Sequence, residues 1–173
     1  MLKLLIPLLG GYLYTQRNPI RIPDSEYGML SPADGVIVSI DNDILTNNRI
    51  VKIFLGLFDV HHQRAPLSGI VKSVDLYNGD TGFCYPETGC PEYNKFILTI
   101  IETEYGDIEI IQKAGGIFSI PISFLTVGQY VEKGETIGKI TFGSGCSTTI
   151  PSNFNIIVEE GQKVYAGQTI IAT

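Results

Sequence analysis

Residues 127–138 have the sequence VGQYVEKGETIG, and residues 158–170 have the similar sequence VEEGQKVYAGQTI. Glycines and apolar residues recur at the same spacing in the two stretches, which indicates an internal repeat. A weaker pair consists of PADGVI at residues 32–37 and PLSGIV at residues 66–71. Because glycine permits tight corners, we expect paired turns that connect short strands.

The rest of the chain is strand-like from Ile22 onward. Apolar and β-branched runs cover residues 35–40, 50–55, 69–76, 96–102 and 108–113, separated by Gly, Pro, Asn and Asp. Residues 78–80 and 105–107 are expected to form hairpin turns. The paired glycine turns resemble the barrel-sandwich hybrid of lipoyl and biotinyl carrier domains. We predict a mainly β fold, a barrel-sandwich-hybrid-like barrel or sandwich of short strands with low helix content.

Composition limits the class of protein. A chain of 173 residues that is 44% hydrophobic can bury a real core in one domain with at most a short appendage. Its net charge of -6, with no basic stripe, argues against a nucleic-acid partner. Cys84, Cys90 and Cys146 lack metal-ligand spacing, so we expect no metal, free thiols and a reducing compartment. A Cys84–Cys90 disulfide is the alternative.

Residues 1–14 form an apolar run, shorter than the roughly 20 residues that span a bilayer. No small-residue cleavage site follows it, so a signal peptide is not indicated. It either lies in a membrane interface, with Tyr12 and Tyr14 at headgroup level, or packs on the core. We divide the chain into residues 1–22, an apolar N-terminal segment with expected membrane contact, and residues 23–173, a single β domain.

Three polar motifs together supply the groups that activate a serine nucleophile. SPADG at residues 31–35 offers the carboxylate of Asp34, DVH at residues 59–61 the imidazole of His61, and FGS at residues 142–144 the hydroxyl of Ser144. An imidazole can take the hydroxyl proton, and a carboxylate can hold the imidazole in the required tautomer. Each residue also has an ordinary explanation, since Asp34 suits a turn cap, His61 a buried structural histidine and Ser144 a solvated loop.

In this order the motifs resemble those of the phosphatidylserine decarboxylases, most closely the short bacterial and archaeal form, over nearly the full length. YLYTQRNPIRIP at residues 12–23 is similar to the family's lead-in, and SPADG matches its S-P-x-D-G box. DVHHQRAPLSG at residues 59–69 is similar to D-V-H-x-x-R-A-P-x-x-G, and KGETIGKITFGS at residues 133–144 matches the run to the self-cleavage site. One box alone would be weak, but four in the correct order are specific.

The resemblance implies a proenzyme that cleaves itself between Gly143 and Ser144. Ser144 would attack the preceding carbonyl, and elimination would convert it into an N-terminal pyruvoyl group, with His61 and Asp34 as the other catalytic residues. Fragments 1–143 and 144–173 would stay associated. The implied reaction removes CO2 from the serine headgroup of a phospholipid, so that phosphatidylserine becomes phosphatidylethanolamine. The implied location is peripheral, on the cytoplasmic face of a membrane, and a homodimer is left open.

The chain departs from the family pattern in three places. Arg64 stands where long forms carry a second histidine, although short forms also have arginine there, which leaves His62 as an unmatched neighbour of His61. AGGIFSIP at residues 114–121 lacks the Arg-Arg pair of short forms, which places the headgroup in question. Ser147 offers a second register because it resembles the serine of the long form's G-S-T box. Ser144 is preferred because it directly follows Gly143.

Other interpretations stay open. One is a homologue that no longer processes itself. Another is a barrel-sandwich carrier domain, although Lys133-Gly134 lacks the pattern that flanks a modifiable lysine. A relative of the sugar phosphocarrier protein would leave FGS without a role. A zinc site from His61, His62 and a cysteine has the least support.

Overall fold

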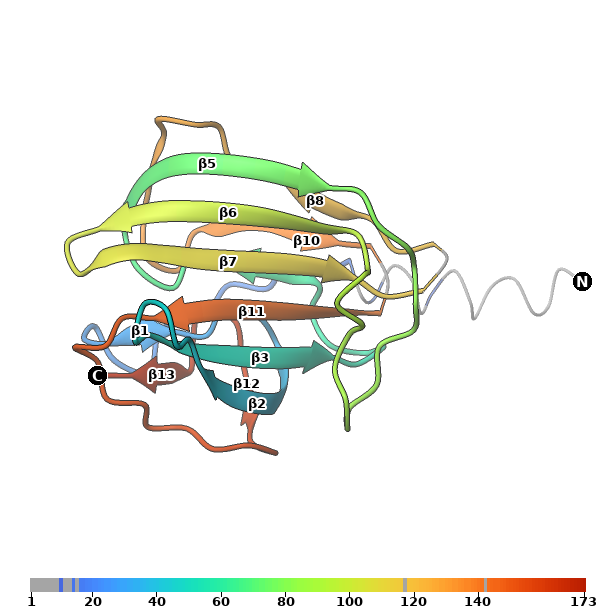
Figure 1. Cartoon of the computed structure of the whole chain (residues 1–173), viewed down its shortest axis with the longest axis horizontal. Coiled ribbons are helices and arrows are strands. Elements are labelled where there is room, and N and C mark those ends of the chain that lie inside the picture. The colour runs from blue at the N-terminus through green and yellow to red at the C-terminus, as the bar shows by residue number, and fades with distance from the viewer. Residues whose placement is uncertain (1–9, 11–13, 15, 117, 142) are drawn as a thin grey trace, which may run out of the picture.

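The computed structural model describes residues 10, 14, 16–116, 118–141 and 143–173, and this part is almost entirely β-structure (Figure 1). Its strands form three sheets. The main sheet has the order β12-β2-β3-β11-β7-β6-β5-β9, a smaller sheet has the order β4-β10-β8, and β1 pairs with β13. The mainly β prediction is confirmed. The strands are β1 Met29–Leu30, β2 Gly35–Asn42, β3 Arg49–Leu55, β4 His62–Arg64, β5 Gly69–Tyr77, β6 Phe96–Thr103, β7 Gly106–Ala114, β8 Pro121–Ser123, β9 Tyr130–Val131, β10 Thr136–Ile140, β11 Ser144–Ile150, β12 Lys163–Val164 and β13 Ile170–Ala172.

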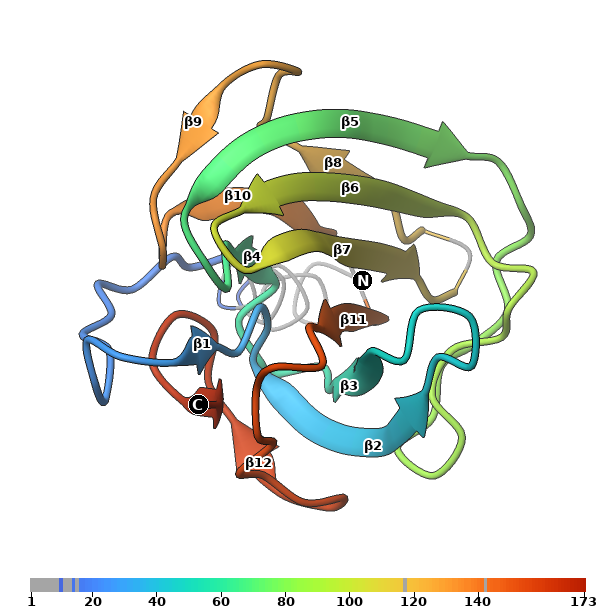
Figure 2. The same ribbon diagram turned by 60° about the vertical axis from the view of Figure 1, so that its left-hand side comes forward.

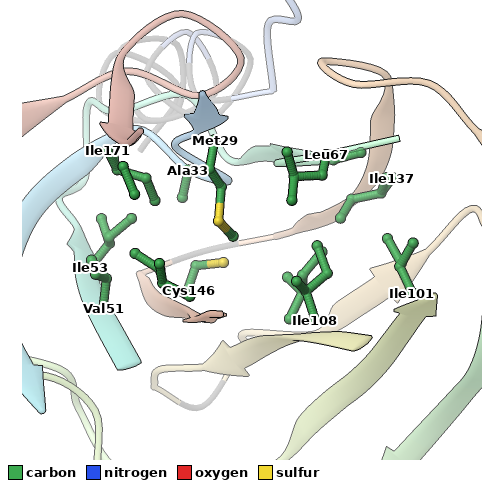
Figure 3. Close-up of a cluster of buried hydrophobic side chains, with 14 of the residues drawn as sticks. Met29, Ala33, Val51, Ile53, Leu67, Ile101, Ile108, Ile137, Cys146 and Ile171 are labelled. Carbon is green, nitrogen blue, oxygen red and sulfur yellow. The ribbon is translucent and has the colours of Figure 1, made fainter. Parts of the chain in front are cut away.

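The main sheet is strongly curved, and the small sheet lies against the inner side of β5, β6 and β7 (Figure 2). Strand residues alternate between buried and more exposed positions, as expected for strands with one face on a core. Val51 and Ile53 of β3, Ile108 of β7 and Ile137 of β10 meet in this core (Figure 3). Cys146 of β11 points into it as well.

The repeat found in the sequence is a repeat of structure. Four of its five glycines have positive φ, a region that favours glycine, with values of +86°, +83°, +83° and +67° at Gly128, Gly134, Gly161 and Gly167. The first copy donates backbone hydrogen bonds to residues 65 and 71, and the second donates the equivalent bonds to residues 31 and 37. Residues 127–138 therefore pair with the chain at residues 65–71, and residues 158–170 pair with the chain at residues 31–37. The two halves of the fold interlock through these backbone hydrogen bonds.

One of the two expected hairpins is confirmed. β6 and β7 pair with Thr103 opposite Gly106, as the turn at residues 105–107 predicted. The prediction of a hairpin turn at residues 78–80 is wrong. A long loop, residues 78–95, connects β5 to β6 instead. The loop is closed by main-chain pairing, in which the Lys95 N–H donates to the Asp80 carbonyl at 2.9 Å.

Cys84 and Cys90 form a disulfide within this loop. The expectation of free thiols is therefore wrong for these two residues, while Cys146 is free and buried. Burial raises the pKa of the Cys146 thiol, which keeps it protonated. The Cys84–Cys90 disulfide packs close to the main sheet, since a Cβ placed on Gly145 of β11 would lie 2.9 Å from Cys90 Sγ.

Most of the apolar N-terminal segment, Tyr12 included, lies outside the described residues, so its membrane contact stays a prediction. Among the residues that are described, no helix is long and apolar enough to span a bilayer.

Candidate active site

Ser144 is the first residue of β11, which lies between β3 and β7 in the main sheet. Its side chain is fully buried, and its Oγ has no hydrogen-bond partner among the described residues. Gly143 before it has φ of +36°, where L-residues with a side chain are strained. The Gly143–Ser144 bond thus joins a tight turn to a buried strand. The Ser144 hydroxyl is not held by a hydrogen bond to any described residue. Phe142 lies outside the described residues.

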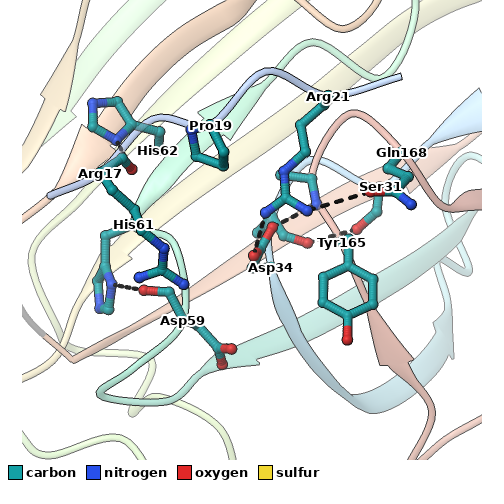
Figure 4. Close-up of polar contacts among 12 residues, drawn as sticks. Arg17, Pro19, Arg21, Ser31, Asp34, Asp59, His61, His62, Tyr165 and Gln168 are labelled. Carbon is teal, nitrogen blue, oxygen red and sulfur yellow. Dashed lines mark hydrogen bonds and ion pairs between the residues drawn. The ribbon is translucent and has the colours of Figure 1, made fainter. Parts of the chain in front are cut away.

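His61 stands immediately before β4 and is 1% exposed. Its Nδ1 lies 2.9 Å from the Asp59 carbonyl oxygen (Figure 4). A carbonyl only accepts, so Nδ1 carries the proton, and Nε2 keeps a free lone pair. Nε2 is buried and has no partner among the described residues. Desolvation is the main cause that lowers the pKa of His61, so the neutral, basic form prevails at pH 7.

Backbone pairing places His61 beside the end of β10, the strand that leads to the candidate cleavage site. The backbone N–H of Ile140, the last residue of β10, donates to the His61 carbonyl at 2.9 Å. Only three residues separate Ile140 from the Gly143–Ser144 bond. His61 Nε2 and Ser144 Oγ, both unpartnered, are not hydrogen-bonded to each other, and catalytic contacts are often loose before reaction.

Asp34 is not hydrogen-bonded to His61, which departs from the expected arrangement. One carboxylate oxygen pairs with Arg21 at 2.7 Å, and the other accepts from the Ala166 backbone N–H at 2.8 Å (Figure 4). In the other repeat, Ser68 Oγ accepts the equivalent bond from the Lys133 N–H at 2.9 Å. Asp34 therefore caps a turn, and the Asp59 carbonyl orients the imidazole. A catalytic role for Asp34 stays a prediction.

Arg64 and His62 both contact the described part of the lead-in, residues 12–23. Arg64 donates to the Asn18 side chain at 2.8 Å and to the Pro19 carbonyl at 2.9 Å. His62 Nδ1 lies 3.2 Å from the Arg17 carbonyl oxygen. The lead-in reaches the residue that follows β10, because Gln16 donates to the Thr141 carbonyl at 3.1 Å. These contacts give Arg64 and His62 anchoring roles.

Ser147 lies in the interior of β11, opposite Lys52 of β3 and Ile111 of β7. It follows Cys146, whose side chain is buried in the core, and no glycine turn precedes it. It lines a cavity of about 280 Å³ together with Gly145, Lys52 and Lys113. The local geometry favours Ser144 over Ser147 as the reactive serine. The described residues contain no group of three His, Cys, Asp or Glu that could hold a metal.

Comparison with known proteins bears directly on this arrangement. A sequence model of the phosphatidylserine decarboxylase family matches residues 11–172, which include all the candidate site residues. The chain belongs to the phosphatidylserine decarboxylase family. It is therefore an enzyme of the carboxy-lyase class. The match over nearly the whole chain sets aside the carrier-domain and phosphocarrier interpretations.

Individual phosphatidylserine decarboxylase relatives agree. A Methanosarcina mazei protein, provisionally named an archaetidylserine decarboxylase proenzyme, is 39% identical over 91% of this chain and 72% of its own. The phosphatidylserine decarboxylase proenzyme of Streptomyces griseus is 39% identical over 95% of this chain and 74% of its own. A provisionally named archaetidylserine decarboxylase proenzyme of Methanothermobacter thermautotrophicus is 32% identical over 96% of this chain and 88% of its own.

Proposed function

We propose that this chain is a self-processing, pyruvoyl-dependent decarboxylase of a phospholipid serine headgroup. The observation that carries the proposal is the Gly143–Ser144 junction, where a glycine with positive φ precedes a buried serine whose hydroxyl has no hydrogen-bond partner in the described part of the chain. The relatives' names support it, since they describe proenzymes of phosphatidylserine and archaetidylserine decarboxylases.

The self-cleavage follows from the groups at this junction. Ser144 Oγ attacks the Gly143 carbonyl carbon, and its proton passes to the free lone pair of His61 Nε2. The C–N bond breaks, the proton is returned to the leaving nitrogen of Ser144, and an ester replaces the amide. Elimination of the Gly143 carboxylate, addition of water and loss of ammonia then produce the pyruvoyl group at position 144.

A bound pyruvoyl group supplies a ketone that captures an amine and accepts the electrons released when CO2 leaves. The residues that follow it offer space for a headgroup. The cavity of about 280 Å³ is lined by Gly145, the next residue, and by Lys52 and Lys113. Glu92 lines the same cavity and pairs with Lys113 at 2.7 Å and with Lys52 at 3.6 Å. We assign this cavity to the anionic headgroup, which would replace the Glu92 carboxylate as the partner of the two ammonium groups and so take the place of the missing Arg-Arg pair.

Exposed apolar side chains surround the site and suit contact with a lipid surface. Phe58 and Phe118 are 69% and 84% exposed. Both are connected to the site, because Arg17 donates to the Phe58 carbonyl and Thr141 to the Phe118 carbonyl. We extend the proposal to peripheral membrane attachment through this edge.

The decisive experiment is intact mass under denaturing conditions for the natural chain, Ser144→Ala and the matched control Ser147→Ala. The natural chain and the control should give fragments 1–143 and 144–173, the smaller one lighter by one ammonia than the corresponding serine peptide. Ser144→Ala should stay whole. A natural chain that stays whole would contradict self-processing and leave the non-processing homologue as the interpretation.

The substrate is tested with the processed protein and vesicles that contain phosphatidylserine or archaetidylserine. Release of CO2 and formation of the ethanolamine lipid from one of them would support the proposed reaction. A processed protein that decarboxylates neither lipid would contradict the proposed headgroup.

A further inference from the structure

The carbonyl oxygen of Gly143 has a side-chain partner from a distant part of the chain. Ser119 Oγ donates a hydrogen bond to it at 3.3 Å. Ser119 is 2% exposed, so water has little access to this contact. The Ser119 backbone N–H donates to the Gly116 carbonyl at 3.1 Å, which holds the residue in a turn. The carbonyl concerned is the one that Ser144 attacks in the proposed self-cleavage.

The chain around Ser119 is fastened to the segment that leads to Gly143. Thr141 Oγ1 donates to the Phe118 carbonyl at 3.0 Å and accepts from the Ile120 N–H at 2.9 Å. These bonds hold the two neighbours of Ser119 on the end of β10. The position of the Ser119 hydroxyl is therefore set before any reaction begins.

Gly115 closes the other side of the same oxygen. A Cβ placed on Gly115 would lie 2.6 Å from the Gly143 carbonyl oxygen, well inside van der Waals contact. Only a residue without a side chain fits there. The oxygen is thus held between the α-carbon of Gly115 and the hydroxyl of Ser119.

We propose that Ser119 is a catalytic residue of self-cleavage, whose hydroxyl stabilises the negative charge that forms on the Gly143 oxygen. The inference rests on the proposed self-processing. When Ser144 Oγ bonds to the Gly143 carbon, the carbonyl π electrons move onto this oxygen, and a buried, preorganised donor interacts more strongly with it than with the neutral carbonyl. The bond is long in the resting state and shortens as the charge develops. Ser119 keeps its own proton throughout.

The test compares Ser119→Thr with Ser119→Val, which have nearly the same shape and differ by the hydroxyl. Freshly made proenzyme is followed over time by denaturing gel and intact mass. The Val variant should cleave on the order of 10²-fold more slowly than the Thr variant, as for the loss of one oxyanion donor. Ser123→Ala is the matched control, because the Ser123 hydroxyl only accepts from the Leu125 N–H, and it should cleave at the natural rate.

Hydroxylamine, which cleaves an accumulated ester, identifies the step. No hydroxylamine-sensitive ester should build up at Gly143 in Ser119→Val if the hydroxyl assists ester formation. A build-up of ester would overturn the assignment, because Ser119 would then act after the acyl shift. Equal cleavage rates for Ser119→Thr and Ser119→Val would also overturn the role of the Ser119 hydroxyl, and self-processing itself would still stand. A natural chain that never cleaves would instead overturn self-processing itself.

Discussion

At the scale of single residues, the partners of His61 and Asp34 define the chemistry of the site. His61 is neutral because burial lowers its pKa, and its tautomer is set by the Asp59 carbonyl. Asp34 binds Arg21 and caps the turn at Ala166 instead. Asp34 acts on His61 only through its charge. This charge raises the pKa of the imidazole by less than desolvation lowers it.

The rate of self-cleavage should fall in acid because protonation removes the lone pair of His61. The pKa lies below the ordinary value of about 6.5, since desolvation and the charge of Arg17 outweigh Asp59 and Asp34. The rate should therefore be constant at neutral and alkaline pH and decline only as the pH falls below the ordinary histidine pKa of about 6.5. Time courses of self-cleavage across this pH range measure the rate. The His61→Gln variant should not cleave itself. A rate that increases toward acid would contradict His61 as the base.

The Arg21–Asp34 ion pair should contribute strongly to stability, since its side chains are 13% and 4% exposed. Asp34→Asn or Arg21→Gln should each lower the free energy of unfolding by about 3 kcal/mol, because the remaining charge loses its buried partner. Denaturant unfolding in a Ser144→Ala background measures this without cleavage. The double variant should lose less free energy of unfolding than the two single variants lose together. Losses that add strictly would show that Arg21 and Asp34 are not coupled.

Lys113 tests the assignment of the headgroup cavity. Lys113→Ala should raise KM for the phospholipid several-fold and leave the rate of self-cleavage unchanged, because the ammonium group lines the cavity and lies outside the cleavage junction. Steady-state decarboxylation of vesicle substrate gives KM and kcat separately. An unchanged KM would remove Lys113 from the headgroup site.

At the scale of elements, β11 explains how a cleaved chain could stay folded. It pairs with β3 on one side and β7 on the other, and both belong to residues 1–143. β12 and β13 of the same C-terminal stretch pair with β2 and β1. Fragment 144–173 is therefore built into the sheets of the larger fragment.

The two fragments should co-elute in native size-exclusion chromatography after cleavage and separate only in denaturant. The ladder hydrogen bonds of β11 and the burial of Cys146 and Ile150 hold the small fragment in place. Mass analysis of the native peak measures the ratio of the fragments. Loss of the small fragment under native conditions would contradict this account of β11.

Within the loop at residues 78–95, the Cys84–Cys90 disulfide closes a smaller loop, residues 84–90. Replacing both cysteines by serine should lower the free energy of unfolding by about 2 kcal/mol, as expected for a short closed loop. Denaturant unfolding with and without dithiothreitol measures this, and the variant should no longer respond to the reductant. Three titratable thiols in the unreduced, unfolded natural chain would contradict the disulfide.

At the scale of the whole molecule, the site and the exposed aromatic residues share one end of the main sheet. β3 and β7 end there and β11 begins there (Figure 1). The net charge of -6 does not favour an anionic lipid surface, so attachment there must rest mainly on apolar contact.

Phe58→Ser together with Phe118→Ser should weaken vesicle binding by at least tenfold, because each exposed ring contributes apolar area to the lipid contact. Co-sedimentation with phosphatidylserine vesicles measures binding. Ile44→Ser is the matched control, since Ile44 is 94% exposed but lies in the turn before β3, at its other end. An equal loss in both variants would contradict a specific membrane-facing edge.

The amino-acid sequence alone determined the features that depend on local backbone preference. The glycine spacing predicted the repeated turns because each of these glycines has positive φ, and alternating apolar residues predicted most strands because side chains alternate along a strand. Gly143 and Ser144 were predicted instead from the FGS motif and from the resemblance to the decarboxylase family. The turn at residues 78–80 was mispredicted because a Gly-containing turn motif does not show how long a connection is.

Which groups meet depends on how the strands are arranged in space. The partner of His61 is a backbone carbonyl, which every residue has and no motif reveals. Asp34 finds Arg21 and Ala166, Cys84 finds Cys90, and Ser119 finds the Gly143 carbonyl, because strands distant in sequence become neighbours in the sheets. Side-chain types limit the chemistry that a chain can perform, whereas contacts across the sheets select which of those groups act together.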